Sequence, residues 1–382
     1  MSQQFDVCIR GGGVVGRTLA LLLARERLRV ALVVKAPEAV ASPAPSDATL
    51  YRDVRAYALN SASRRVLESL RGWPDDSATT PVVEMQVWGD DGGRLDFSAQ
   101  SVAQSALAWI VDVPSLEQQL SEAIRFQPQI ELVQAPVKAA LQVVCEGQKS
   151  RSRNEFGASW TVKPYNQKAI AARLVSDKPH RGVARQWFSR GEILALLPIS
   201  DENGGIKGNS VALVWSVPAE RADTLQKLSD DDFCSVLQAA CGEIPGHLAL
   251  SSERASWPLT LSNADRWIGP GWALAGDAAH TVHPLAGQGL NLGLADVAEL
   301  ADVIARREYW RPLGDEKLLR RYERARKADV AVMGSVADGL HGLFAQTDAR
   351  WQALRHWGLK GFAQSGLLKT WVVRQEIGRA HV

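Results

Sequence analysis

The stretch GDAAHTVHPLAGQGLNLGLAD, residues 276–296, gathers the side chains of this chain that are best suited to chemistry. His280 and His283 could ligate a metal ion, and Asp277 could accept hydrogen bonds. Both histidines precede Pro284 in an irregular loop, without an H-E-x-x-H pattern or a third ligand. We therefore interpret them as structural and predict no metal site. The glycines of the stretch favour a loop that holds a larger ligand.

The elements around this stretch place its carboxylate at the end of a strand. Residues 272–275 (WALA) are an apolar run typical of a strand, and Gly276 and Asp277 follow directly. After Gly287-Gln288-Gly289, a helix is predicted from Leu290 onward through NLGLADVAELADVIARR. A helix N-terminus offers free N–H groups and partial positive charge to an anionic or electron-rich group.

A second glycine cluster lies near the N-terminus, where a β-α-β unit is predicted. Residues 5–9 (FDVCI) and 30–34 (VALVV) are apolar strands of the kind found in parallel sheets covered on both faces. Between them, Gly11, Gly13 and Gly16 form G-x-G-x-x-G ahead of the helical run TLALLLARERL. In this pattern the glycines allow a tight turn, approach of the backbone to a pyrophosphate, and close helix–strand packing. The unit therefore predicts dinucleotide binding.

One feature expected of such a unit is missing. An acidic residue at the end of the second strand usually holds the adenosine ribose. Here that end reads Val33-Val34-Lys35, and the nearest acid, Glu38, lies beyond Pro37. We expect the ribose to be held in another way or more loosely.

The bulk composition excludes several classes of protein. The chain has 382 residues, a net charge of +2 and 46% hydrophobic residues, so we expect a globular protein without a nucleic-acid partner. The four cysteines form no C-x-x-C pair, which favours a reducing compartment over a disulfide framework. We expect no signal peptide before the first strand, because no charged and apolar leader pattern occurs there, and no apolar run reaches the roughly 18 residues of a membrane span. We predict a cytoplasmic location.

Two glycine turns that each lead into a helix suit a long ligand with two anionic or electron-rich parts, and here a resemblance emerges. Residues 276–296 resemble the second flavin motif of the FAD-dependent aromatic monooxygenases, closest to the ubiquinone-biosynthesis hydroxylases and similar to para-hydroxybenzoate hydroxylase. Residues 53–60 (DVRAYALN) resemble the family segment whose arginine lies along FAD, and 145–153 (CEGQKSRSR) its central Asp-Gly motif. The resemblance covers nearly the whole chain. It implies that FAD is bound by Gly11, Gly13, Val14, Gly16, Arg55, Glu146, Gly147, Gly276, Asp277, Pro284, Ala286, Gly287, Gln288, Gly289 and Asn291.

The chain departs from the family pattern at three further places. Glu146-Gly147 replaces the Asp-Gly pair, which lengthens the acidic side chain by one methylene. The segment between Leu120 and Cys145 is short, with little room for the β-hairpin that the family inserts there. Val113 replaces an amide-bearing residue near the flavin.

The fold implied by the resemblance is α/β (α+β overall), with a Rossmann-like FAD-binding domain interleaved with a β-sheet substrate domain and C-terminal helices. Residues 1–75, 111–160 and 261–330 would form the FAD-binding domain. Residues 76–110 and 161–260 would form the substrate domain, with 331–382 as the C-terminal helical region.

The resemblance also implies the reaction: FAD is reduced by transiently bound NAD(P)H, and one oxygen atom of O2 is inserted into an aromatic ring. The protein's tasks are orientation, charge stabilisation and exclusion of water. We name no catalytic general base, but Arg55, Gln186 and His283 are candidates for lining the pocket beside the ring.

Three functions stay open at this point. The first is hydroxylation of a polyprenyl phenol or quinone precursor in ubiquinone biosynthesis, and the second is hydroxylation of a small soluble aromatic. The third is a non-hydroxylating, flavoprotein-like partner subunit, which the departures suggest. The tail from His356 to Ala380 mixes aromatic and basic residues and would either contact a membrane surface or a protein complex, or close the core as an amphipathic helix.

Overall fold

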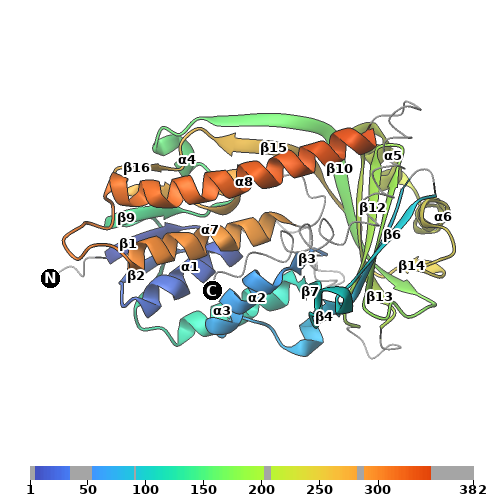
Figure 1. Ribbon diagram of the computed structural model, residues 1–382, viewed down its shortest axis with the longest axis horizontal. Coiled ribbons are helices and arrows are strands. Elements are labelled where there is room, and N and C mark those ends of the chain that lie inside the picture. Colours follow the sequence, from blue (N-terminus) through green and yellow to red (C-terminus); the bar gives the residue numbers. More distant parts are fainter. Residues whose placement is uncertain (1–4, 35–53, 90–91, 202–207, 282–287, 346–382) are drawn as a thin grey trace, which may run out of the picture.

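Figure 1 shows an elongated molecule in which two sheets and their helices lie side by side. The computed structural model describes residues 5–34, 54–89, 92–201, 208–281 and 288–345, with side chains up to Ala331 except that of Gln288. The predicted α/β fold is confirmed. None of the helices in these ranges is long and apolar enough to cross a membrane.

The first sheet is mainly parallel and carries the N-terminal glycine turn at the end of its central strand. Its order is β16-β17-β9-β1-β2-β8, and only the β16–β17 pair is antiparallel. The bounds are Phe5–Arg10 for β1, Val30–Val33 for β2, Ile130–Val133 for β8, Ala139–Val144 for β9, Ile268–Gly269 for β16 and Trp272–Leu274 for β17. The apolar runs at 5–9, 30–34 and 272–275 are thus strands of one sheet, as predicted.

Helices cover this sheet because their apolar faces match its buried strands. The bounds are Val14–Arg25 for α1, Val113–Arg125 for α3, Gln288–Ala305 for α7 and Glu316–Ala345 for α8. Helix α7 packs between α1 and α8, and buries residues on most of its circumference, including Leu294, Val297 and Ile304. Helix α8 runs along the length of the molecule (Figure 1). Its Leu318 and Leu319 join the same core as β1 and β17.

The second sheet is larger and forms the other half of the molecule. Among the described residues its order is β18-β15-β10-β13-β12-β11-β5-β6, with β14 paired to β10. The bounds are Glu84–Trp88 for β5, Arg94–Ser98 for β6, Trp160–Ser176 for β10, Val183–Ser189 for β11, Glu192–Pro198 for β12, Ser210–Pro218 for β13, Leu248–Leu250 for β14, Ala255–Ala264 for β15 and His280–Thr281 for β18. Helices α5 (Ala219–Lys227) and α6 (Asp230–Cys241) pack on one face of this sheet through a core that includes Trp215 and Phe233.

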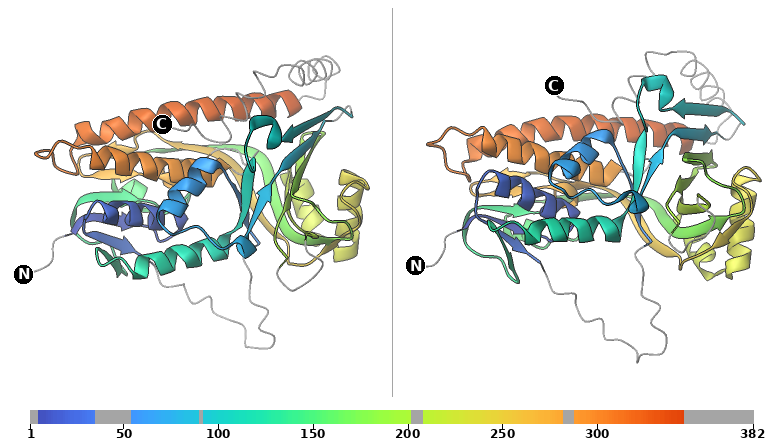
Figure 2. Two further views of the ribbon diagram at one scale, coloured as in Figure 1. Left: turned by 60° about the horizontal axis from the view of Figure 1, so that its bottom comes forward. Right: turned by 90° about the horizontal axis from the view of Figure 1, so that it is seen from below.

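A small sheet and the long strand β10 join the two halves. Strands β3 (Ala56–Leu59), β7 (Ala108–Asp112) and β4 (Thr79–Val82) form the small sheet, and α2 (Ser61–Ser69) follows β3. A separate apolar cluster contains Ile110 of β7 together with Ala212 of β13. Figure 2 shows the long strands β10 and β15 of the large sheet extending alongside the first sheet. Several short elements also occur in the described chain. These are α4 (Ser152–Glu155) and the 3-10 turns η1 (Asp76–Ala78), η2 (Gln100–Val102) and η3 (Gly276–Ala278).

The short segment between Leu120 and Cys145 holds two strands that do not pair with each other. Strand β8 pairs with β2 and strand β9 pairs with β1, both in parallel. Two strands of a hairpin pair with each other in antiparallel fashion, and β8 and β9 do not. Both strands belong to the first sheet, so this segment contains no hairpin. The four cysteines, Cys8, Cys145, Cys234 and Cys241, are free thiols.

Candidate flavin site

The first glycine turn is built by close backbone approach. Gly11 has φ +123°, and a Cβ there would overlap the carbonyl oxygen of Cys145 at the end of β9. A Cβ on Gly16 would overlap the carbonyl oxygen of Gly11 itself. Both positions therefore need glycine, because any side chain would push α1 away from the sheet.

Gly13 in the same turn has a different environment. It is the N-cap of α1 without a side-chain cap, and the first turn of that helix has no acidic residue. A Cβ on Gly13 would meet no atom within 4 Å. Among the described residues, the position of this Cβ is therefore open beside the N-terminus of α1, where Val14 begins the helix and the free N–H groups favour an anionic ligand.

The second glycine turn lies at the end of β17. Gly276 has φ +64°, a left-handed conformation that suits glycine, and starts the turn η3. The next residue, Asp277, is exposed. A Cβ on Gly289, in the first turn of α7, would lie 4.0 Å from Oδ1 of Asp277. The carboxylate and the N-terminus of α7 therefore border the same space.

The surroundings of Asp277 shift the pKa of its carboxyl group. The surrounding protein desolvates the carboxyl group and raises its pKa, while His280 and Arg55 act in the opposite direction. Arg55 is exposed just before β3, and this interaction places it within electrostatic reach of Asp277. The structure thus brings together two predicted FAD residues that are more than 200 positions apart in the sequence.

The two glycine turns meet across the α1–α7 contact. A Cβ on Gly276 would lie 3.4 Å from both methyl groups of Val15 in α1. A Cβ on Gly293 in α7 would lie 2.9 Å from a methyl group of Val15. Such close packing sets the two helix N-termini beside one another, which suits a ligand that spans both.

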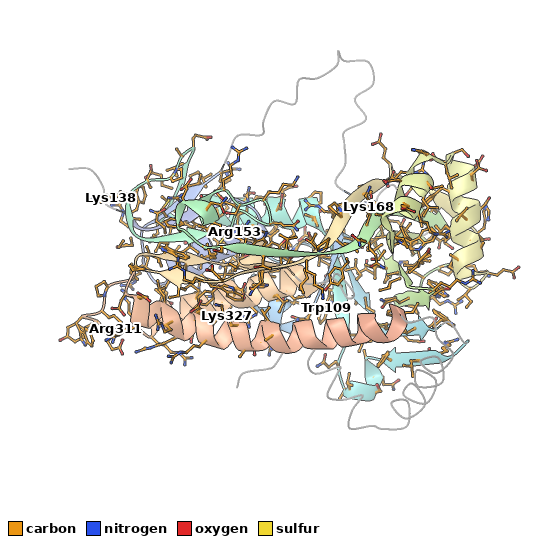
Figure 3. All side chains as sticks on the ribbon, turned by 90° about the horizontal axis from the view of Figure 1, so that it is seen from above. Trp109, Lys138, Arg153, Lys168, Arg311 and Lys327 are labelled. Atoms are coloured by element: carbon orange, nitrogen blue, oxygen red, sulfur yellow. The ribbon has the colours of Figure 1, made fainter. Side chains whose placement is uncertain are left out.

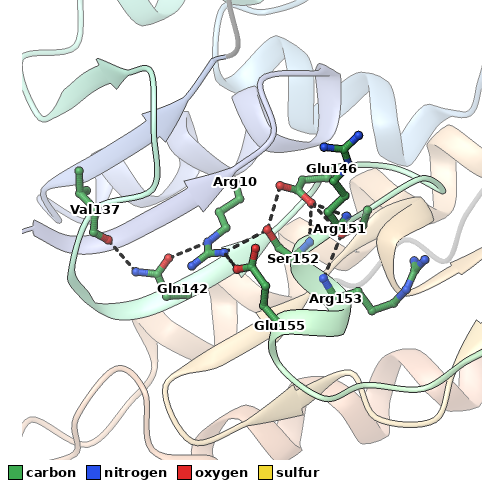
Figure 4. A network of polar contacts seen from close by, with 9 residues as sticks. Arg10, Val137, Gln142, Glu146, Arg151, Ser152, Arg153 and Glu155 are labelled. Carbon is green, nitrogen blue, oxygen red and sulfur yellow. Dashed lines mark hydrogen bonds and ion pairs between the residues drawn. The ribbon is translucent and has the colours of Figure 1, made fainter.

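Glu146 orders the loop that follows β9 (Figure 4). Its carboxylate accepts hydrogen bonds from the hydroxyl groups of Ser150 (2.8 Å) and Ser152 (2.9 Å). It also accepts from the backbone N–H groups of Arg151 (3.2 Å) and Ser152 (3.1 Å). The longer side chain of glutamate therefore caps α4, and Gly147 beside it has φ +78° with open space around it.

Arg10, the last residue of β1, extends this network. Its guanidinium donates to Gln142 Oε1 (3.1 Å) and Ser152 Oγ (3.0 Å), and forms an ion pair with Glu155 (2.5 Å). The strand that carries the first glycine turn is thereby linked to the Glu146 loop (Figure 4).

Arg153 links the same loop to the second glycine turn. It lies beside the long strand β10 (Figure 3), and the residue is 4% exposed. Nη1 donates to the carbonyl of Ala278 (3.0 Å), Nη2 donates to that of Gln148 (3.2 Å), and the group lies 3.6 Å from the ring centroid of Trp160. Burial lowers its pKa, opposed by Glu146. From the sequence, Arg153 is only one residue of the 145–153 motif. Its contact with Ala278 could not be predicted, because the two residues are 125 positions apart in the chain.

His280 and Asn291 have structural partners. His280 Nε2 lies 2.7 Å from Asp296 Oδ2, and its ring stacks on Trp267 with 4.6 Å between centroids. No cluster of three or more metal-ligating side chains occurs among the described residues. The Asn291 amide donates to the carbonyl of Ala58 and accepts from the N–H of Asn60. Its predicted contact with FAD stays a prediction.

Some predicted residues fall outside the described ranges. These are His283, Pro284, Ala286 and Gly287, and the side chain of Gln288, whose backbone begins α7. At the end of β2, Val34 takes the place of the expected acid, and a Cβ on Gly12 would lie 2.9 Å from one of its methyl groups. Val113 is buried at the start of α3.

One row of side chains lies on the face of the large sheet opposite α5 and α6. Gln186, Ala195, Val214 and Ala171 are cross-strand neighbours in one row. The adjacent row, which includes Trp187 and Leu194, points into the core beneath α5 and α6. Because neighbours in one row share a face, Gln186 lies on the face turned away from those helices, where a pocket beside the flavin was expected.

Comparisons with known proteins agree with this geometry. Residues 110–334 match the family described as FAD binding domain. The chain is 30% identical to the ubiquinone hydroxylase UbiL of Rhodospirillum rubrum, over 98% of this chain and 89% of UbiL. It is 29% identical to the 3-demethoxyubiquinol 3-hydroxylase of Escherichia coli, over 99% of both chains. The crystal structure of P. aeruginosa PqsL in complex with 2-aminobenzoylacetate has a TM-score of 0.74 at 22% identity, covering 94% of this chain and all of PqsL.

The mainly parallel sheet, with a glycine-rich turn leading from β1 into α1, defines a protein of the dinucleotide-binding type. The chain belongs to the FAD-binding-domain family and is a flavin-dependent monooxygenase with FAD as its cofactor. Membership of this family implies that the enzyme acts on an aromatic substrate and uses O2.

Proposed function

We propose that this monooxygenase hydroxylates the aromatic ring of a polyprenyl phenol or quinone precursor in ubiquinone biosynthesis. The relatives named as ubiquinone hydroxylases, which match over nearly the whole chain, support this substrate class. The observation that carries the proposal is the position of the Asp277 turn. It lies where α1, α7 and the strand β18, which extends the large sheet, come together.

We further propose that FAD binds along the two glycine turns. The residues that would hold it are Gly11, Gly13, Val14, Gly16, Arg55, Glu146, Gly147, Gly276, Asp277, Pro284, Ala286, Gly287, Gln288, Gly289 and Asn291. When bound, FAD takes electrons from NAD(P)H and activates O2. The open space at Gly13 beside the N-terminus of α1 supports the placement of the pyrophosphate, and the N-terminus of α7 would stabilise negative charge on the flavin.

The large sheet would supply the wall on the substrate side. The row that contains Ala195 and Val214 offers small apolar side chains, which leave room for a ring and keep water away from it. Gln186 is the amide in the same row, and could orient a phenol hydroxyl. No side chain of this row has the chemistry of a nucleophile, so its tasks are orientation and exclusion of water.

The domain boundaries and the cellular contacts are also proposals. We assign 1–75, 111–160 and 261–330 to the FAD-binding domain, 76–110 and 161–260 to the substrate domain, and 331–382 to a C-terminal region. The separate cores of the first sheet and of the large sheet support this division. Peripheral contact with a membrane or protein complex would involve the tail from His356 to Ala380, which lies outside the described residues.

The test is incorporation of labelled oxygen. Holoenzyme, NAD(P)H and 18O2 are incubated either with a phenol that carries a short prenyl chain or with the same phenol without the chain. We expect one 18O atom in the ring of the prenylated phenol and much slower reaction of the unprenylated one. Equal rates for the two would favour a small soluble aromatic as substrate, and absence of 18O from both products would contradict the proposal.

A further inference from the structure

Asp296 of α7 is a fully buried carboxylate that no proposed contact with FAD uses. It accepts hydrogen bonds from the backbone N–H of Gly276 (2.9 Å), from Nε2 of His280 (2.7 Å) and from Nε of Arg326 (2.8 Å). An ionised carboxylate only accepts hydrogen bonds, so the Nε2 atom of His280 carries the proton. Three donors from two segments, the Asp277 turn and α8, thus converge on one side chain.

Two of these donors stand at the two ends of the turn that carries Asp277. Gly276 directly precedes Asp277, and His280 follows it by three residues. The turn is closed by one internal hydrogen bond, from the N–H of Ala279 to the carbonyl of Gly276 (2.8 Å). One carboxylate on α7 therefore ties both ends of the turn to the helix whose N-terminus borders Asp277.

We infer that Asp296 is a positioning residue for the flavin site: through Gly276 and His280 it holds Asp277 in place for FAD, and Arg326 of α8 balances its charge. The inference rests on the FAD cofactor of the family. Its consequence is that side chains buried behind the turn, which do not face the cofactor space, set the affinity for FAD.

The surroundings of the carboxylate keep it ionised and rigid. Burial favours the neutral acid, but His280 and Arg326 outweigh it and hold the pKa of Asp296 below its ordinary value. Arg326 is itself held by Asp329 (2.7 Å), and Trp267 stacks on the ring of His280. A buried charge with several good hydrogen bonds has little freedom to move, which suits a group that fixes the geometry of a neighbouring turn.

Tyr322 offers a matched control from the same neighbourhood. Its side chain is fully buried, and its hydroxyl donates to the carbonyl of Leu274 in β17 (2.8 Å). Substitution Tyr322→Phe removes a buried hydrogen bond close to the turn but leaves the three donors of Asp296 in place. Any effect that comes only from loss of stability should appear in this variant as well.

The experiment measures FAD affinity and melting temperature in the full-length protein stripped of FAD. FAD binding is followed by quenching of flavin fluorescence at a temperature well below all melting transitions. The variants are Asp296→Asn, His280→Leu, His280→Gln and Tyr322→Phe. Glutamine carries an amide that can donate to Asp296 in place of the imidazole, whereas leucine keeps only the contact with Trp267.

We expect Asp296→Asn and His280→Leu to weaken FAD binding by about 10- to 100-fold, because each loses a hydrogen bond to a charged group. His280→Gln should recover most of the affinity that His280→Leu loses. Tyr322→Phe should melt at a lower temperature than the wild-type protein and still bind FAD with nearly unchanged affinity. If Asp296→Asn does not fold, the two His280 variants carry the test.

Two results would overturn the inference alone. One is a loss of FAD affinity in Tyr322→Phe as large as in His280→Leu, and the other is equal FAD affinity in His280→Leu and His280→Gln. A wild-type protein that binds no FAD would overturn the cofactor assignment together with the inference, so the two failures are distinguishable.

Discussion

The Cα of Gly276 lies 3.4 Å from the position that a Cβ on Gly293 would occupy. Gly276 starts the turn with Asp277, and Gly293 lies in the second turn of α7. This approach brings the α7 N-terminus to the carboxylate, and Val15 fills the remaining space from α1. The proposed flavin site therefore depends on close packing at these glycines as well as on the groups assigned to the cofactor.

Gly13 and Gly16 should respond differently to alanine. Gly16→Ala places a methyl group on the carbonyl of Gly11 and should lower the free energy of unfolding by about 1–3 kcal/mol or more through overpacking. Gly13→Ala meets no atom within 4 Å and should change stability by about 1 kcal/mol or less. Its methyl group projects into the space assigned to the pyrophosphate, so FAD affinity should fall. Denaturant unfolding and FAD titration of both variants check this, and an unchanged FAD affinity in Gly13→Ala would contradict the placement.

Asp277 should reduce the stability of the FAD-free protein at neutral pH. Desolvation raises the pKa of its carboxyl in the folded state. The folded protein then binds the proton more tightly than the unfolded chain, so stability is lost as the pH rises above the ordinary value towards the raised one. Asp277→Asn removes this loss. We expect a higher melting temperature than wild type at pH 7 and a difference that shrinks towards pH 4, together with weaker FAD binding. A variant that is less stable at pH 7 would argue against this.

Restoring the acid at the end of β2 should tighten FAD binding. Val34 lies against Gly12 where a carboxylate usually accepts hydrogen bonds from the adenosine ribose. Val34→Glu should increase FAD affinity by about tenfold, the effect of one hydrogen bond to a charged group. Val34→Gln has the same length without the charge and should gain less. Titration with FAD and with FMN shows whether the gain in affinity depends on the adenosine part of FAD. FMN lacks the adenosine, so its affinity should not change.

Ala195 tests the substrate wall. Ala195→Phe would fill space on the sheet face opposite α5 and α6, next to Gln186 and Val214. We expect FAD affinity to stay near that of wild type while the acceleration of flavin reduction by a phenol is lost. Leu194 points to the other face, into the core, so Leu194→Ala should cost about 2–5 kcal/mol of stability. If Ala195→Phe responds to the phenol like wild type, this face is not the substrate wall.

The elements of the fold that could be predicted are those determined by residues adjacent in the sequence. The runs at 5–9, 30–34 and 272–275 are strands of one sheet because burial on both faces demands continuous apolar residues. The glycine turn at 11–16 and the start of α7 near Leu290 also follow from local conformational preferences. The division of roles among polar residues could not be predicted in this way. Glu146 caps α4, and Asn291 joins α7 to Ala58, 233 positions away. Such partners depend on the order of strands and the packing of helices, which periodicity does not report.

The most direct test of the account is an anaerobic titration of the FAD-loaded protein with NADH and with NADPH, followed by visible absorption of the flavin. We expect bound FAD to be bleached, and a phenol with a prenyl chain to accelerate the bleaching. A protein that retains no FAD, or that holds FAD without reduction by either donor, would contradict its assignment as a working monooxygenase.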